Sequence, residues 1–172
     1  FYPGKNLGAY GEAGAITTDN ELVYNKLISL RNHGQSERYK HDMIGYNYRM
    51  DGIQGAVLRV KLRYLDKWTD ARRAHANLYN ELLSDVECTV PMVTDDRHVY
   101  HIYSVLVDQR DHVQKSLGNS GINTNIHYPI PVHLQGAYSD LGYKKGDFLI
   151  TENLSTKFLS LPMYAELSEE QI

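Results

Sequence analysis

The feature that most constrains the fold is a long amphipathic pattern that begins near Asp51. Apolar side chains recur every three or four residues along it, and neither Gly nor Pro interrupts residues 56–84. The stripe consists of Ile53, Val57, Val60, Tyr64, Trp68, Ala71, His75, Leu78 and Leu82. A helix of about thirty residues is roughly 45 Å long at ~1.5 Å per residue. We therefore expect a helix over 51–84 that buries one face and connects two subdomains.

Shorter elements precede this helix. Residues 13–18 are a small, β-branched run typical of a strand. Asp19 and Asn20 can cap a helix over 21–30, which the sequence Asn32-His33-Gly34 would end. The polar residues 34–46 are expected to form a loop.

The sequence after the long helix alternates between strand and helix patterns. Residues 98–107 are rich in β-branched and aromatic side chains without a breaker, so they predict a strand. A short helix is expected over 109–117 and a second strand over 122–127. Residues 128–146 suggest a loop with a helical turn, and 148–159 an amphipathic helix.

Composition and charge exclude several classes of protein. The chain has 172 residues, 42% of them apolar and 23% charged, which is typical of a soluble globular protein. Its formal net charge of −3 provides no field that would steer a nucleic acid. No apolar run approaches the ~20 residues of a membrane-spanning helix. Cys88 is the single cysteine, so no intrachain disulfide can form, and we expect a cytoplasmic protein without a nucleic-acid or membrane partner.

The first candidate site is the glycine-rich segment from Pro3 to Gly14, which contains Lys5. A lysine in such a loop can bind phosphate, but the P-loop spacing GxxxxGK[ST] is absent. A lysine acts as a nucleophile only after it loses a proton, which requires desolvation or a nearby cation. From these residues alone, Lys5 is either a nucleophile or an ordinary surface lysine.

The second candidate site is the segment GYNYRM, residues 45–50, directly before the long helix. The guanidinium of Arg49 can bind a phosphate or a carboxylate through two hydrogen bonds, and the amide of Asn47 can donate to a phosphate oxygen. The alternative is a capping loop that packs its two tyrosines.

The third candidate site is the segment IHYPIPVH, residues 126–133. Its two prolines stiffen a loop that carries His127 and His133. Two histidines are too few for a catalytic zinc ion, which generally has three protein ligands. We therefore expect no metal at this site.

Four segments together carry a resemblance that none of them carries alone. They are FYPGKNLGAYGEAGAITT, GYNYRMDGIQGAVLRVKL, HYPIPVHLQGAY and LSLPMYAELSEEQI, in this order along the chain. In this order they resemble the DegT/DnrJ/EryC1/StrS family of pyridoxal-phosphate-dependent sugar aminotransferases over essentially the whole chain. The pattern FxPxKxLG followed by GExGA is the most specific part of the match.

The resemblance implies a fold and its domains. It implies an α/β protein, a fold-type I pyridoxal-phosphate-dependent transferase. Residues 1–50 would be a remnant of the large cofactor-binding domain, 51–84 the connecting helix, and 85–172 an α+β small domain.

The resemblance also implies roles for five residues. Lys5 would form the covalent Schiff-base link to pyridoxal phosphate, and Asn47 would reach the cofactor phosphate in the neighbouring subunit of a homodimer. Arg49, His127 and Tyr128 match positions that help to bind a nucleotide-sugar substrate, largely across the dimer interface. Glutamate would supply the amino group, and Lys5 would also act as the base that moves a proton between substrate and cofactor.

Some parts of the family's active site have no match in this sequence. The acidic partner of the pyridine nitrogen and the ring-stacking group lie upstream of the lysine in the family, so we expect the sequence to be partial. One subgroup of the family has histidine in place of the lysine and catalyses dehydration, which Lys5 argues against. The alternatives are a noncatalytic fragment or dimerisation module, and a generic phosphate-ligand domain that would use Lys5, Asn47 and Arg49.

Overall fold

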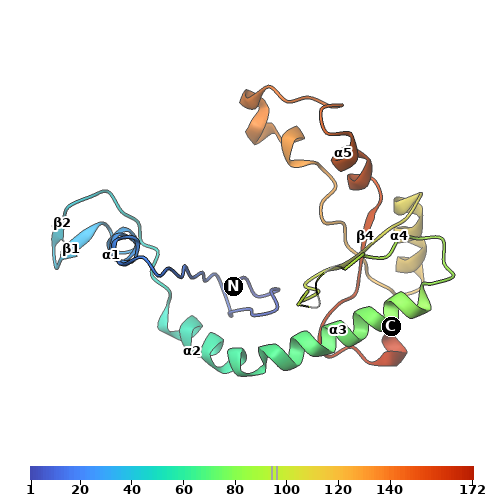
Figure 1. Ribbon diagram of the computed structural model, residues 1–172, viewed down its shortest axis with the longest axis horizontal. Coiled ribbons are helices and arrows are strands. Elements are labelled where there is room, and N and C mark those ends of the chain that lie inside the picture. The colour runs from blue at the N-terminus through green and yellow to red at the C-terminus, as the bar shows by residue number, and fades with distance from the viewer. Residues whose placement is uncertain (94, 96) are drawn as a thin grey trace. The chain divides into compact units, whose positions relative to one another are not determined.

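The computed structural model describes residues 1–93, 95 and 97–172, and it divides the chain into two compact units (Figure 1). The first unit is Phe1–Leu65 and the second is Asp66–Ile172. The boundary falls within the long helical stretch. The three-part domain division expected from the family resemblance therefore stays a prediction.

The first helix of the first unit confirms the predicted caps and bounds. α1 spans Glu21–Leu30, and the side-chain oxygen of Asn20 accepts a hydrogen bond from the backbone N–H of Val23 at 3.1 Å. This bond satisfies one of the free N–H groups at the helix start. The chain leaves the helix through His33 and Gly34, with φ of 60° and 71°. The left-handed conformation stops the helix where the sequence predicted it.

Two predictions for the first unit were wrong. The expected loop over 34–46 contains a small antiparallel ribbon of β1 (Gln35–Glu37) and β2 (Lys40–His41). Its residues are polar on both faces, so no hydrophobic alternation identified them. The expected strand over 13–18 is not assigned as a strand. The Ala13 carbonyl accepts a hydrogen bond from the Phe1 amino group at 2.8 Å, but one such bond does not make the ladder that a strand requires.

The long helix is confirmed over most of its predicted length. It consists of α2 (Gly52–Lys61), a single 3₁₀ turn η1 (Leu62–Tyr64) and α3 (Leu65–Leu82). The backbone of Lys61 and Leu65, which flank the turn, stays in the right-handed helical region. The chain is therefore helical from Gly52 to Leu82, with one tighter turn that the side-chain periodicity did not reveal.

The second unit is built on a small antiparallel sheet. β3 (Tyr103–Leu106) pairs with β4 (Phe158–Leu161), with Ser104 opposite Ser160. Isolated bridges from Thr89 to Leu106 and from Asn125 to Ser160 widen the sheet by one short segment on each side. The predicted strand over 98–107 is confirmed only in its second half, and that over 122–127 is reduced to the bridge at Asn125.

Helices and turns flank this sheet. α4 (Arg110–Asn119) lies close to the helix predicted over 109–117 and contacts β4. The helical turns expected within 128–146 are η2 (Val132–Leu134) and η3 (Gly136–Leu141), and a last turn, η4, covers Glu169–Gln171. The predicted helix over 148–159 was wrong in its second half, because α5 spans only Leu149–Ser155 and β4 follows. A short apolar run such as FLSL fits a buried helix and a strand equally well. This run is a strand because it pairs with β3.

Aromatic side chains from α3 and β3 form the centre of the core in the second unit. The rings of Tyr79 and Tyr103 stack with centroids 4.8 Å apart. Their hydroxyls donate to the Pro162 carbonyl at 3.0 Å and to the Asn80 side-chain oxygen at 2.6 Å. The buried hydrophobic core consists of Ala76, Tyr79, Tyr100, Tyr103, Val105 and Leu159.

A buried arginine attaches α3 to the loops beside the sheet. One Nη of Arg72 donates to the carbonyls of Tyr100 at 3.1 Å and Met163 at 2.8 Å. Burial lowers the pKa of Arg72, and the charge of Glu166 opposes this shift. Arg72 thus satisfies two backbone carbonyls from segments far apart in the sequence. No helix among the described residues is long and apolar enough to cross a membrane.

We predict that Leu159→Ala destabilises the protein by about 2 to 5 kcal/mol, because Leu159 is fully buried and its truncation leaves a cavity in the core. Urea unfolding followed by circular dichroism measures this loss. Leu82→Ala is the matched control, because Leu82 is 57% exposed, and it should change the unfolding free energy by less than about 0.5 kcal/mol. Equal losses from both variants would contradict the core described above.

Candidate functional site

The Lys5 loop is a tight turn that requires a glycine. The backbone N–H of Lys5 donates to the Tyr2 carbonyl at 2.9 Å, and that of Ala9 donates to the Phe1 carbonyl at 2.8 Å. A Cβ added at Gly8 would overlap the Pro3 carbonyl group, so this position accepts no side chain without a shift of the backbone. The predicted motif therefore has a direct geometric reason for its glycine.

Two side chains of α2 hold this loop. The Lys61 ammonium donates to the Gly8 carbonyl at 2.7 Å, and the backbone N–H of Tyr10 donates to the Gln54 side-chain oxygen at 2.8 Å. The Lys61 ammonium also lies 5.1 Å from the centre of the Tyr10 ring, a distance suited to a cation–π interaction. No sequence pattern predicted that Gln54 and Lys61 would hold the loop.

The Lys5 side chain is exposed. Among the described residues its amine has no hydrogen-bond or ion-pair partner. The loop therefore presents a primary amine to solvent from a backbone that is fixed on both sides.

The segment with Asn47 and Arg49 lies along the end of α1. Three backbone hydrogen bonds hold it there, from Tyr46 to the Leu30 carbonyl at 2.7 Å, from His33 to the Tyr46 carbonyl at 2.9 Å, and from Tyr48 to the Arg31 carbonyl at 2.9 Å. The rings of Tyr46 and Tyr48 stack with centroids 5.0 Å apart. The segment thus closes the end of α1 and packs its tyrosines against each other, as the capping-loop alternative predicts, and it leaves Asn47 and Arg49 exposed.

Arg49 has a partner that the sequence did not identify. Its Nη1 donates to the Asn32 side-chain oxygen at 2.7 Å, and the Asn32 side-chain nitrogen donates to the Gln35 side-chain oxygen at 3.2 Å. The sequence assigned Asn32 only to the helix stop, because its separation from Arg49 follows no helical or strand period. The chain of bonds holds the guanidinium at the end of α1.

His127 and Tyr128 lie in the second unit, beside β4. The Nδ1 atom of His127 forms a 2.8 Å hydrogen bond with the Oγ atom of Ser160. The two rings of His127 and Tyr128 meet edge to face at 5.3 Å, and the Tyr128 side chain is mostly exposed. The loop therefore holds one ring against the sheet and presents the other to solvent.

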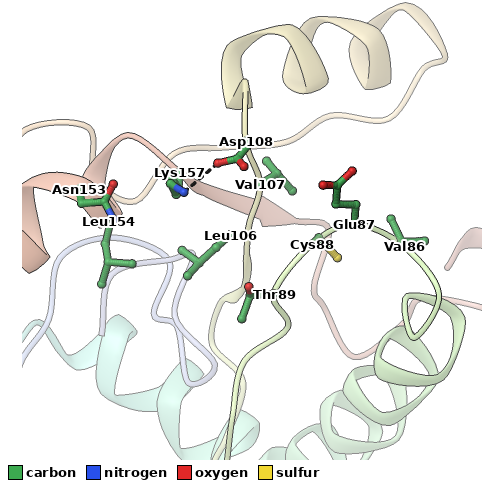
Figure 2. Close-up of a pocket in the computed structure, with 10 residues that line it drawn as sticks. All are labelled: Val86, Glu87, Cys88, Thr89, Leu106, Val107, Asp108, Asn153, Leu154 and Lys157. Carbon is green, nitrogen blue, oxygen red and sulfur yellow. Dashed lines mark ion pairs between the residues drawn. The ribbon is translucent and has the colours of Figure 1, made fainter.

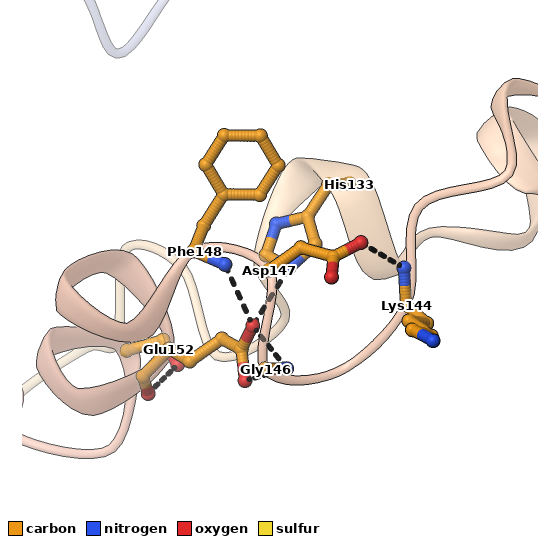
Figure 3. Close-up of polar contacts among 7 residues, drawn as sticks. His133, Lys144, Gly146, Asp147, Phe148 and Glu152 are labelled. Atoms are coloured by element: carbon orange, nitrogen blue, oxygen red, sulfur yellow. Dashed lines mark hydrogen bonds and ion pairs between the residues drawn. The ribbon is translucent and has the colours of Figure 1, made fainter.

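His133 does not join His127 but pairs with Glu152 of α5 (Figure 3). Its Nε2 atom lies 3.1 Å from the Glu152 Oε1 atom, and both side chains are largely buried. The same carboxylate accepts the backbone N–H of Gly146 at 2.8 and 2.9 Å and that of Phe148 at 3.2 Å. The Phe148 ring covers the His133 ring at 4.7 Å. We call His133, Gly146, Phe148 and Glu152 the Glu152 clasp.

The contacts of the Glu152 clasp lower the pKa of the Glu152 carboxyl. Desolvation raises the pKa of the carboxyl, but the hydrogen bonds from Gly146, Phe148 and His133 outweigh it, so the pKa lies below the ordinary value. The clasp thus favours the ionised carboxylate.

The five predicted site residues divide between the two units. Lys5, Asn47 and Arg49 belong to Phe1–Leu65, whereas His127 and Tyr128 belong to Asp66–Ile172. Among the described residues no hydrogen bond or ion pair joins Lys5 to Asn47 or Arg49. Their roles stay predictions.

A cavity of about 350 Å³ in the second unit contains none of these five residues (Figure 2). It lies beside β3, and its wall includes Cys88 and the ion pair of Lys157 with Asp108, whose charged atoms are 2.7 Å apart. Burial raises the pKa of the Cys88 thiol, which disfavours the reactive thiolate. No three His, Cys, Asp or Glu side chains gather as metal ligands in the part of the chain that the structure describes.

The exposed groups define the chemistry that the first unit offers. A primary amine can condense with an aldehyde or ketone, and amide and guanidinium donors bind phosphate. Lys5 therefore offers chemistry suited to a carbonyl group, and Asn47 and Arg49 offer donors suited to a phosphate.

Comparison with protein families gives a match over the whole chain. The model of the DegT/DnrJ/EryC1/StrS aminotransferase family matches residues 1–172. The pleiotropic regulatory protein of Geobacillus stearothermophilus is 43% identical over 99% of this chain and 47% of its own length. The dTDP-3-amino-3,4,6-trideoxy-alpha-D-glucose transaminase of Streptomyces venezuelae is 38% identical over 99% of this chain and 46% of its own length.

Solved structures have the same fold. The crystal structure of S. venezuelae DesV in complex with a ketimine intermediate matches with a TM-score of 0.95 and 38% identity, over 99% of this chain and 47% of that one. The structure of NtdA from Bacillus subtilis with bound cofactor PMP matches with a TM-score of 0.85 and 31% identity. This match covers 99% of this chain and 42% of that one. The chain thus spans about half the length of the relatives it matches.

We predict that Glu152 stabilises the protein at neutral pH and loses this effect in acid. Since the folded-state pKa of its carboxyl is lowered, the stabilisation is present above the unfolded-state pKa and is lost as the pH falls through the folded-state value. The unfolding free energy of Glu152→Gln should therefore lie below that of the wild type at neutral pH, and the difference should shrink in acid.

The control is Asp140→Asn. The Asp140 side chain is exposed and has no hydrogen bond or ion pair among the described residues. The unfolding free energy of this variant should follow that of the wild type across the pH range. A constant difference between Glu152→Gln and the wild type at every pH would contradict the ionised clasp.

Proposed function

The chain belongs to the DegT/DnrJ/EryC1/StrS aminotransferase family, and we propose that it carries the lysine of a pyridoxal-phosphate-dependent active site. The proposed reaction transfers an amino group from glutamate to a keto-sugar linked to a nucleotide. The observation that carries the proposal is the amine of Lys5, which is exposed without a partner among the described residues in a loop that Gln54 and Lys61 hold.

The chemistry of the exposed groups fits the cofactor. Pyridoxal phosphate supplies an aldehyde, a phosphate and a ring that accepts electrons. Lys5 would hold the aldehyde carbon through its Nζ atom, and the Asn47 amide would donate to a phosphate oxygen. Because Asn47 is uncharged, it adds specificity for phosphate without adding to the local charge.

Lys5 has a second proposed role when its amine is released by the amino donor. The neutral Nζ atom would take a proton from the substrate carbon and deliver it to a carbon of the cofactor. The fixed backbone of the loop supports this role, because proton transfer requires a base held within hydrogen-bond reach of the reacting atom.

Arg49, His127 and Tyr128 are proposed to bind the nucleotide-sugar substrate. The Arg49 guanidinium suits a diphosphate, because it can donate two parallel hydrogen bonds. The exposed phenol of Tyr128 and the ring of His127 suit sugar hydroxyls or phosphate oxygens. The substrate in the name of the S. venezuelae transaminase, a dTDP-linked amino sugar, supports this class of ligand.

The proposed assembly is a fold-type I transferase that works as a homodimer with shared sites. The match to solved sugar aminotransferases supports the fold. In this proposal Phe1–Leu65 is part of the large domain, and Asn47 of one subunit reaches the cofactor held by Lys5 of its partner.

One observation favours the alternative of a noncatalytic dimerisation module. In the first unit only Ala9 and Leu58 are buried hydrophobic residues, whereas Leu22, Ile44 and Ile53 are more than 70% exposed. Such a surface suits contact with other protein. The Lys5 variant below separates the two proposals, because a dimerisation module needs no reactive lysine.

We predict that Lys5→Ala abolishes transamination and leaves the fold intact. The loss of proton transfer alone should lower turnover by a factor on the order of 10² to 10⁴. The measurement follows glutamate-dependent amination of nucleotide-linked keto-sugars, with circular dichroism as the check of the fold. Lys26→Ala, an exposed lysine of α1, is the matched control and should keep wild-type turnover. Turnover retained by Lys5→Ala would overturn the proposal.

We also predict that mixing Lys5→Ala with Asn47→Ala protein restores part of the activity. In a mixed dimer with shared sites, one site has both residues intact and the other has neither. The measurement compares turnover before and after the two variants are unfolded and refolded together. No recovery, although each variant recovers its fold alone, would argue for sites within one subunit.

A further inference from the structure

We propose that Ser160 is a positioning residue for His127 and fixes the tautomer in which the His127 Nε2 atom carries the proton. This inference deepens the proposed function, because it rests on the substrate-binding role of His127. It gives a role to Ser160 of β4, to which the sequence analysis assigned none.

The backbone around Ser160 is held in place by two neighbouring segments. β4 pairs with β3 at this position, where Ser160 lies opposite Ser104. Ser160 also exchanges two backbone hydrogen bonds with Asn125, at 2.7 and 3.1 Å. Asn125 lies two residues before His127, so the same bridge that fixes Ser160 also fixes the chain that leads into the His127 loop.

The Ser160 hydroxyl is buried, and its hydrogen-bond partner is His127. Ser160 is 4% exposed, and its Oγ atom lies 2.8 Å from the His127 Nδ1 atom. Among the described residues the Ser160 hydroxyl has no other acceptor for its proton. A buried hydroxyl proton without an acceptor destabilises the folded protein, because its hydrogen bond to water is lost and not replaced.

The need of the buried Ser160 proton for an acceptor selects one direction for the hydrogen bond between Ser160 and His127. If Nδ1 carried the ring proton and donated it, the Ser160 proton would have no acceptor. If the hydroxyl donates to Nδ1, the neutral ring carries its proton on Nε2, and the buried Ser160 proton has an acceptor. The Nε2–H group is then a donor suited to an acceptor oxygen of the substrate.

Ser104 provides a matched control on the adjacent strand. Its Oγ atom is also buried, but it has no hydrogen-bond partner in the part of the chain that the structure describes. Ser104→Ala therefore removes a buried hydroxyl from the same sheet without the loss of a hydrogen bond. Ser160→Ala removes a hydroxyl of the same size together with its bond to His127.

The first measurement is the tautomer of His127 in the purified protein with ¹⁵N-labelled histidine rings. The pH is set well above the ordinary histidine range so that the rings are neutral. The chain has eight histidines, and the signals absent from His127→Gln identify those of His127. We expect the Nε2–H tautomer alone in the wild type and in Ser104→Ala, and a mixture of tautomers in Ser160→Ala. A Ser160→Ala spectrum identical to that of the wild type would overturn the inference.

The second measurement separates this inference from the proposed function. In the transamination assay, Ser160→Ala should raise KM for the nucleotide sugar by a factor of about 2 to 10, as expected for one hydrogen bond, with little change in kcat. A changed tautomer with an unchanged KM would overturn the substrate role of His127 but leave the Ser160 bond intact. An equal rise in KM in Ser160→Ala and Ser104→Ala would show that the effect comes from a disturbed sheet. That result would overturn the positioning role of Ser160.

Discussion

The continuous helical backbone from Gly52 to Leu82 supplies side chains that organise both units. In the first unit α2 supplies Gln54 and Lys61, which hold the backbone of the Lys5 loop. In the second unit α3 supplies Arg72, which bonds two distant carbonyls, and Tyr79, which stacks in the core. Each unit is thus organised by its own part of one helix. A helix is suited to this role because its backbone needs no partner from either unit.

Polar contacts, more than apolar burial, position the candidate site residues. Gln54 and Lys61 form hydrogen bonds with the Lys5 loop. Asn32 forms one with Arg49, and Ser160 forms one with His127. A hydrogen bond fixes direction as well as distance, whereas apolar contact fixes neither closely. Lys5, Asn47, Arg49 and Tyr128 therefore stay exposed, and His127 half-buried, while their backbones or neighbours are held. This arrangement suits a site whose ligand must enter and leave.

Local patterns predicted the helices well and the strands poorly. The sequence placed α1 at its observed bounds, because Asn20 and Gly34 act on their immediate neighbours. It missed β1 and β2 and extended a helix over β4, because pairing between strands depends on residues far apart in the chain. For the candidate site, the motifs identified Lys5 and its glycines. They could not identify Asn32, Gln54 or Ser160, since each acts through a contact between segments that no sequence period relates.

The proposed function requires that the amine of Lys5 bind pyridoxal phosphate covalently. The most direct measurement adds pyridoxal phosphate to the purified protein, reduces it with borohydride and locates the adduct by peptide mapping. We expect modification confined to Lys5, with exposed lysines such as Lys26 unmodified at the same cofactor concentration. Labelling scattered over the surface lysines, or none at Lys5, would contradict it.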